Sequence, residues 1–426
     1  MLVAVVMLFV IGAMAALSID VVTLYTARSE AQQAADGAAL AGARVLANSG
    51  MTSASGIVSV PWATAVAWAT AVAQQVAANN PVGGRNLSPA GACPGGEICV
   101  SIPNELASNF FANPHVTVQV QRSDLPTFFA RIWGRTTITV KASATAEAYN
   151  PSNVPGTSAN PKLPVATMCV KPWLVPNVSP DPGAANPQIF DPATGAILDT
   201  TLLGYRTTGQ AKRLQPACDP DCSGGTPLAS SYHYYPGDPT TTFPPPTQAL
   251  PSCTPALTSP YQESIAGCIQ TPIACNSQAF IDTSSNPTRN AETADAVTCL
   301  THTQNNNGDQ YDNAGGAGPP FQFIAGSDNP VPGIGGNNVM VSDSLVTVPV
   351  FDVADGATPP TPPNPVTIIG FLQLFLNPAG NATTNGAAGS MRTKVINLVG
   401  CGTNPIGPQP ILGNGASPVA VRLISP

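Results

Sequence analysis

The first nineteen residues carry no charge, and no other feature restricts the fold of this chain as strongly. Met1–Ile19 contains no Asp, Glu, Lys or Arg. At about 1.5 Å per residue, a helix of this length reaches roughly 30 Å, which is enough to cross the hydrocarbon core of a bilayer. The sequence therefore predicts a transmembrane segment at residues 1–19.

A cleaved signal peptide is the alternative interpretation of this apolar run. Such a peptide begins with basic residues, but no Lys or Arg precedes the run here. Ala13, Ala15 and Ala16 are small enough for a cleavage site, yet the residues after them continue as a helix rather than as a loop. We therefore expect membranes to retain the full chain, with trimming near Ala16 as the outcome that the alternative predicts.

The residues after the apolar run favour one continuous helix. From Asp20 to Asn48 there is no Pro, and Asn48-Ser49-Gly50 has the composition of a helix C-cap. Small or apolar residues recur at three- and four-residue steps, at Leu24, Ala27, Ala31, Ala34, Ala38 and Ala41. This face is expected to pack on the protein's own strands at 115–148 and, near the membrane, on an assembly partner. Helix propensity alone is the simpler explanation of the alanines.

Two motifs lie in the first third of the chain. Residues 20–43 contain an Asp, an aromatic residue and an Arg, followed by the run Gln-Gln-Ala-Ala-Asp-Gly-Ala-Ala-Leu-Ala-Gly-Ala. Residues 124–134 read Asp-Leu-Pro-Thr-Phe-Phe-Ala-Arg-Ile-Trp-Gly and precede an alternating strand. Both resemble the TadE/TadG-like proteins of tight-adherence (Flp) pilus assembly, with Gly37 where Ala is more usual.

That resemblance implies a single-pass inner-membrane protein with a pilin-like helix and a body in the periplasm or at the cell surface. Its expected role is to assemble or anchor a pilus. The expected partners are the membrane and other pilus-assembly proteins or pilins, in a homo- or hetero-oligomer. The resemblance implies no catalytic residues and no cofactor.

Charge and cysteine content restrict the compartment and the partners. Only 9% of residues are charged, against roughly 25% in ordinary soluble domains. The 16 Lys and Arg residues are scattered in a chain of net charge -7, so nucleic-acid binding is not expected. The ten cysteines in a Pro-rich chain predict disulfides formed outside the cytoplasm. Zinc is the alternative, but Cys218-x3-Cys222 has no second ligand pair.

The periodicity predicts an α+β fold: a transmembrane helix that continues into a long pilin-like helix, then a β-rich, loop-rich body with disulfides. Four segments follow: 1–19 as the transmembrane segment, 20–150 as the pilin-like helix plus strands, 151–338 as a Pro/Gly/Cys-rich insert, and 339–426 as a C-terminal β-rich segment. A second helix is expected at 61–79, and Cys93 and Cys99 bracket a small loop suited to a disulfide. Strands are expected at 115–121, 136–148, 338–341, 344–351, 366–376 and 394–399. A short helical turn is expected at 105–113, and a short helix or a crossover at 127–133. Pro349 indicates a sheet edge or a bulge.

Several segments contain side chains that carry chemistry in other proteins, but none predicts a catalytic, cofactor-binding or metal site here. Asp282–Asn286 follows too short an apolar run for a von Willebrand A metal site and reads as an Asx or Ser turn. Asn305–Asn313 lacks the acid spacing of an EF-hand and reads as a solvated loop. The remaining candidates have similarly simple interpretations. His115 lacks partner ligands and reads as an ordinary strand residue, and His233 among its tyrosines favours a buried turn cluster over a small-ligand or glycan platform. Gly333-x-Gly335-Gly336 has no helix after it and is not a phosphate loop.

Three functions remain open from the sequence. A structural or accessory role in pilus assembly is preferred, without enzymatic activity. A surface adhesin or glycan-binding module on the same anchor would concentrate exposed aromatic residues in 171–338. A secreted hydrolase would show a deep pocket with converging titratable groups.

Overall fold

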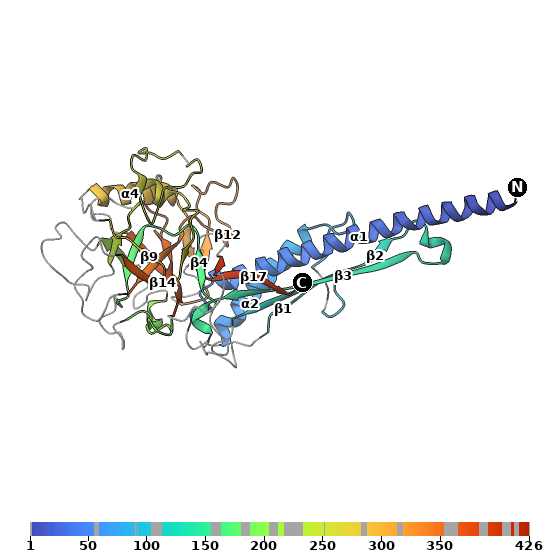
Figure 1. Ribbon diagram of the computed structural model, residues 1–426, viewed down its shortest axis with the longest axis horizontal. Helices are drawn as coiled ribbons and strands as arrows, with labels where there is room; N and C mark the ends of the chain where they lie inside the picture. The colour runs from blue at the N-terminus through green and yellow to red at the C-terminus, as the bar shows by residue number, and fades with distance from the viewer. Residues whose placement is uncertain are drawn as a thin grey trace.

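The computed structural model of the chain has a long helical stalk that ends in a β-rich head (Figure 1). It describes residues 2–54, 59–89, 91, 93–103, 113–154, 163–179, 188–203, 212–216, 233–250, 252–282, 288–312, 318–352, 365–382, 391–402, 410–412 and 417–425. The expected helical turn at 105–113 and the Cys218/Cys222 pair lie outside these residues, apart from Asn113.

One helix, α1 (Leu2–Asn48), forms the axis of the stalk and runs without interruption for 47 residues. Gly50, which has φ +78°, follows its last turn and confirms the expected C-cap. The alanine face is buried as predicted, since Ala31, Ala34 and Ala38 are completely inaccessible. Ala41 is only half-buried, because the buried face also includes Ala35, Ala39 and Ala43.

A second helix and a four-stranded sheet cover the buried part of α1. The helix is α2 (Ser59–Asn79), which confirms the helix expected at 61–79. The sheet order is β1 (Ile98–Ser101), β2 (His115–Pro126), β3 (Thr137–Tyr149) and β17 (Ala420–Ser425), and all neighbouring strands are antiparallel. Because α1 contacts β2 and β3, the part of the packing prediction that concerns the protein's own strands is confirmed.

The head is built on a closed barrel of six strands. Each strand pairs with the next in the ring β13 (Leu345–Phe351), β5 (Trp173–Pro176), β7 (His233–Pro236), β6 (Lys212–Pro216), β15 (Met391–Gly400) and β14 (Val366–Leu376), and β14 pairs again with β13. Closure leaves these strands without a free edge. The predicted strands at 344–351, 366–376 and 394–399 are confirmed as β13, β14 and most of β15.

Small elements surround the barrel. They are β4 (Val165–Thr167), β8 (Ile273–Ala274), β9 (Gln278–Ala279), β10 (Gln310–Asp312), β11 (Gln322–Ile324), β12 (Asn338–Val339), β16 (Ile411–Leu412), α3 (Pro260–Ala266), α4 (Thr288–Leu300) and the 3₁₀ turns η3 (Pro151–Asn153) and η4 (Thr200–Leu202). Pro349 does not lie at an edge, because β13 is paired on both sides; a bulge follows between Val350 and Phe351. Strands from segments 151–338 and 339–426 form one barrel, and the domain boundaries themselves remain a prediction.

Within the described residues, four disulfides connect the eight cysteines found there. The pairs are Cys93–Cys99, Cys169–Cys268, Cys253–Cys299 and Cys275–Cys401. The first is the small loop expected from the sequence. Three pairs join segments of the head that lie 99, 46 and 126 residues apart. Because long closed loops lose the most entropy in the unfolded state, these three pairs are expected to contribute most to stability.

The disulfides with the longest and the shortest closed loops, Cys275–Cys401 and Cys93–Cys99, provide a matched test of this ranking. Replacing both Cys275 and Cys401 by Ser should lower the free energy of unfolding by roughly 5 kcal/mol, and replacing both Cys93 and Cys99 by roughly 2 kcal/mol. The measurement is denaturant unfolding of the full chain in detergent. Equal losses in the two double variants would contradict the ranking.

Two glycines of α1 provide a second matched test. A Cβ at Gly42 would lie 2.9 Å from the Val116 side chain and 3.3 Å from the Ala69 carbonyl oxygen, whereas at Gly37 the nearest atom is 3.8 Å away, on Val76. Gly37→Ala should therefore raise the free energy of unfolding by up to about 1 kcal/mol, because Ala has the higher helix propensity. Gly42→Ala should lower the free energy of unfolding by about 1 kcal/mol or more, because overpacking outweighs the same gain in helix propensity.

Thermal unfolding of the two variants beside the wild type measures both effects. If Gly42→Ala proves as stable as Gly37→Ala, the close approach of α1 to β2 and α2 is not a constraint on the fold.

Candidate functional site

The N-terminal end of α1 projects beyond the β2–β3 hairpin and the rest of the protein as an apolar helix (Figure 1). Its large side chains are exposed, including Val3, Met7, Ile11, Met14 and Val22. In the part of the chain that the structure describes, Val10–Asn48 contains one helical stretch that is long and apolar enough to cross a membrane. Burial in the stalk begins near Ala27, so the apolar helix changes there from exposed to packed.

The first charged side chain of α1 holds the far end of the β2–β3 hairpin. Asp20 is only 5% exposed, and its carboxylate accepts hydrogen bonds from the backbone N–H groups of Phe128 (2.9 Å), Phe129 (3.0 Å) and Ala130 (2.8 Å). These amides begin the 3₁₀ helix η2 (Ala130–Trp133), where N–H groups lack partners within the helix. An ionised carboxylate is a strong acceptor for such amides, so Asp20 fastens the hairpin to α1.

Residues 127–136, here called the hairpin tip, are closed by their own hydrogen bonds. The Thr127 N–H donates to the Thr136 carbonyl oxygen, and the Arg135 N–H donates to the Ala130 carbonyl oxygen. Gly134, with φ +80°, ends η2 in a left-handed conformation that favours glycine. The short helix expected at 127–133 is confirmed as η2, and the tip is a compact turn rather than a crossover between sheets.

Ion pairs and backbone contacts brace the hairpin below the tip. Arg122 is buried and donates to the carbonyl oxygens of Val82 and Gly83 and to the Asp124 carboxylate. Glu30 of α1 accepts from the Gly83 N–H at 2.5 Å. The neighbouring Arg122 guanidinium lowers the pKa of the Asp124 carboxyl group. These contacts join α1, the loop after α2 and β2 in the part of the stalk that is farther from the head.

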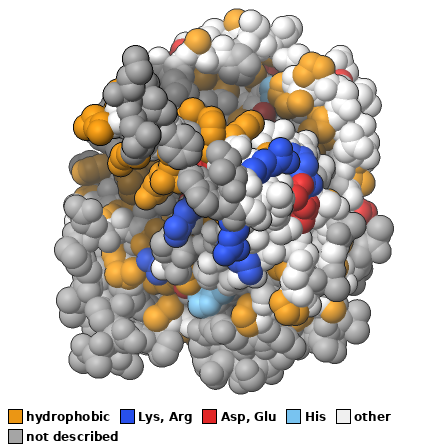
Figure 2. Space-filling view, turned by 90° about the vertical axis from the view of Figure 1, so that its right-hand side faces the viewer, with side chains coloured by type: hydrophobic (Ala, Val, Ile, Leu, Met, Phe, Trp, Pro, Cys, Tyr) orange, Lys and Arg blue, Asp and Glu red, His pale blue; other side chains and the backbone are white. Residues whose placement is uncertain are grey.

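The tip and the start of α1 lie on one face of the molecule. Figure 2 views the protein from the side on which α1 projects, and Lys and Arg side chains lie among hydrophobic ones there. Phe128 is 63% exposed at the tip, and Arg131 and Arg135 are also exposed. The two motifs of the sequence analysis thus meet in space, since Asp20 belongs to the first and Phe128–Ala130 to the second. The sequence did not predict this contact, because the partners lie 108 to 110 residues apart.

A buried network of amides and hydroxyls joins the stalk to the head. The Asn397 side chain of β15 donates to the Ala47 carbonyl oxygen at the end of α1 (2.6 Å) and to the Gln373 side chain of β14 (2.6 Å). Its oxygen accepts from Ser53. A bulge leaves Ile396 without a strand partner, which turns Asn397 toward α1.

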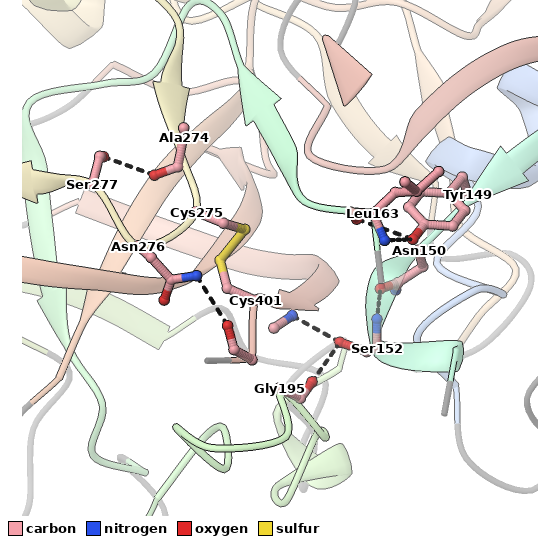
Figure 3. Close-up of a disulfide and its surroundings, with 12 residues drawn as sticks. Tyr149, Asn150, Ser152, Leu163, Gly195, Ala274, Cys275, Asn276, Ser277 and Cys401 are labelled. Carbon is pink, nitrogen blue, oxygen red and sulfur yellow. Dashed lines mark hydrogen bonds between the residues drawn. A yellow bond between two sulfur atoms is a disulfide. The ribbon is translucent and has the colours of Figure 1, made fainter. Parts of the chain in front are cut away.

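The end of β3 reaches the same region. Figure 3 shows the Cys275–Cys401 disulfide beside Asn150 and Ser152. The Asn150 side chain donates to the Leu398 carbonyl oxygen (2.9 Å), and Ser152 connects the Gly400 N–H with the Gly195 carbonyl oxygen. These contacts fasten the stalk sheet to the head.

The polar segments singled out in the sequence do not form a ligand site in the described residues. Asp309 is buried, and its carboxylate accepts from the Gly326 N–H and from the side chains of Asn329 and Ser342. It therefore holds a turn together, although the sequence indicated a solvated loop. Of the Asp282 segment, residues 283–287 lie outside the described residues. Tyr234 and Tyr235 are buried, as the buried-cluster interpretation requires, and the His233 side chain is not described.

Ligand-type side chains are dispersed in the described ranges. His115 lies beside Glu147 (3.8 Å) and His302 beside Asp343 (2.9 Å), and no group of three His, Cys, Asp or Glu residues lies close together in these ranges. Burial lowers the pKa of Lys171 to about 7, but its Nζ donates to the carbonyl oxygens of Ile265 and Gly267 in the interior. The absence of a catalytic or metal site remains a prediction.

Comparison with known proteins decides the identity of the N-terminal segment. The Tad family model, described as Flp pilus-assembly TadE/G-like, matches residues 1–45. The chain carries a TadE/G-like N-terminal segment. No curated protein and no solved structure matches the chain. The TadE/G-like segment covers nearly all of α1 and includes Asp20, and it supports a role in Flp pilus assembly.

The contact made by Asp20 can be tested directly. Asp20→Asn keeps the shape of the side chain but removes the charge and one acceptor oxygen, so the amides of Phe128, Phe129 and Ala130 should exchange hydrogen for deuterium about tenfold faster. Exchange measured by mass spectrometry on the peptide that contains the tip reports this. Asp36→Asn is the control, because it removes a charge from the same helix at a carboxylate that accepts from Gln32 of α1 rather than from the hairpin. Unchanged exchange in Asp20→Asn would show that the carboxylate does not hold the hairpin.

Proposed function

We propose that this protein is a non-enzymatic component of Flp pilus assembly, anchored in the inner membrane by residues 1–19, with its body on the non-cytoplasmic side. The observation that carries the proposal is the continuity of α1. The same helix is exposed and apolar at its N-terminal end and packed by alanines from Ala27 onward. A helix with these two halves suits a protein that is half in lipid and half in a folded body.

The disulfides support the placement of the body. Eight cysteines are paired in the described residues, and three of the pairs fasten distant segments of the head. Such pairs persist in oxidising compartments and are rare in the cytoplasm. The body therefore belongs in the periplasm or at the cell surface, and its partners are other pilus-assembly proteins or pilins.

The adhesin alternative has less support. It required exposed aromatic side chains in 171–338, but the described large aromatics of that segment are mostly buried, among them Trp173, Phe190, Tyr234, Phe243, Tyr261 and Phe323. Among the described residues of 171–338, the large hydrophobic side chain that is exposed is Val331, which is aliphatic. A glycan platform needs flat aromatic surface, which these positions do not offer.

Cell fractionation tests the anchor and the placement together. The full chain should sediment with membranes, whereas a chain that begins at Asp20 with an exchangeable secretion signal should be released as soluble protein. Protease added to spheroplasts should degrade the body of the full chain. A native protein that is soluble and trimmed near Ala16, or a body that resists protease until the membrane is lysed, would overturn the proposal.

Loss of the gene should abolish surface pili, and the full-length chain should restore them. The form without residues 1–19 is the matched control and should not. Piliation that is unaffected by the deletion would separate this protein from pilus assembly even if the anchor were correct.

A further inference from the structure

The hairpin tip is held at the height along α1 where the apolar run ends. Asp20 is the first residue after Ile19, and its carboxylate binds the backbone of Phe128, Phe129 and Ala130. If residues 1–19 span the bilayer, the tip cannot lie far from the membrane surface, because side-chain hydrogen bonds fix it to the helix at that point. The polar headgroup region extends roughly 5–7 Å beyond the hydrocarbon core on each side.

The tip has the side chains of a membrane-interface segment. Phe128 is 63% exposed there. Arg131 and Arg135 are exposed and form no ion pair within the part of the chain that the structure describes. Exposed aromatic residues beside Arg suit the headgroup layer, where a ring meets the acyl boundary and a guanidinium meets phosphate.

The charge of the tip is opposite to that of the whole protein. The chain has a net charge of -7, but between Asp124 and Glu147 it contains Arg131, Arg135 and Lys141 and no Asp or Glu. Asp20 does not present its charge outward, because it is buried beneath the tip. Asp124 pairs with Arg122 and Arg85 at the base of the hairpin. An acidic body near an anionic bilayer is repelled, so basic residues are most useful at the place that approaches the lipid.

We propose that the hairpin tip binds anionic phospholipid headgroups through Arg131 and Arg135, with Phe128 at the acyl boundary. The protein thereby contacts the membrane at two points, the span and the tip, and the second contact fixes the tilt and rotation of α1. This inference rests on the proposed membrane anchor. It commits to lipid as the occupant because the tip is joined to the end of the span and because its charge is complementary to anionic headgroups.

The test uses the full chain in vesicles of phosphatidylcholine alone or with about one third phosphatidylglycerol. Hydrogen–deuterium exchange of the peptide containing residues 127–136 should be slower in the anionic vesicles by about fivefold for each Arg that binds. The protection should disappear at about 1 M salt, where screening acts within roughly 3 Å.

Two variants make the result specific. Arg131→Gln with Arg135→Gln should remove the lipid-dependent protection. Lys141→Gln is the matched control: it is an exposed cation of the same hairpin, four residues beyond the start of β3 and therefore roughly 13 Å from the tip. It should retain the protection. Exchange that is equal in both vesicles, or protection that survives in the double Arg variant, would overturn the proposal.

Flotation of the same vesicles separates this inference from the anchor. All variants should float with lipid, because α1 is intact in each of them. If the wild type floats but its tip exchanges equally in both vesicles, the anchor stands and the tip contact is wrong. If the wild type does not float, the anchor itself is wrong.

Discussion

Close packing along the alanine face of α1 is the constraint on which the rest of the structure depends. Ala31, Ala34, Ala35, Ala38 and Ala39 are completely buried, and each offers only a methyl group to its neighbours. Small side chains contribute little apolar area individually, so the contact is favourable only when the backbones approach closely over many residues. At Gly42 the approach to β2 and α2 is close enough that a Cβ would lie 2.9 Å from the Val116 side chain. The straight stalk follows from this requirement, because a bend would open the contact along its length.

Polar contacts then determine where the two ends of the stalk lie. At one end Asp20 binds three amides of the hairpin tip, and at the other Asn397 binds the last turn of α1. Asn397 is completely buried, and removing its amide would leave the Ala47 carbonyl oxygen without its partner in the interior. An unsatisfied buried group of this kind costs about 1–3 kcal/mol. Apolar packing therefore supplies the stability of the stalk, and the amide and carboxylate contacts supply its register.

The elements with long, regular patterns were predictable from the sequence, and the contacts between distant residues were not. α1, α2, β2, β3 and the barrel strands β13, β14 and β15 each have a run long enough to show periodicity or continuous hydrophobicity. The four-residue strands β5 and β7 lie in Pro-rich surroundings and are strands only because the barrel pairs them. β17, near the C-terminus, pairs with β3, which lies in the first third of the chain, and local patterns cannot reveal such a pairing.

The candidate site shows the same division. Both of its motifs were recognisable, but nothing in either predicts that Asp20 receives the amides of the other, since backbone donors carry no sequence signature. The bulge that turns Asn397 toward α1 could not be predicted from the sequence either, because Ile396 is a normal strand residue. The sequence showed Arg131 and Arg135 only as scattered basic residues, and it is the contact with α1 that places them beside the end of the apolar run.

Asp20 and the continuous helix α1 together couple the N-terminal part of the molecule to its head. An ionised carboxylate is costly in hydrocarbon, and here its cost is offset by three backbone donors at the point where the apolar run ends. If residues 1–19 span a bilayer as proposed, this residue sets the depth of the helix and the place of the hairpin at the same time. From there α1 continues as one helix, packed from Ala27 onward, to Ala47, whose carbonyl oxygen is bound by the head. A change in the tilt of the N-terminal half must then move the head, because the helix between them is continuous and is packed on two sides by α2 and the sheet.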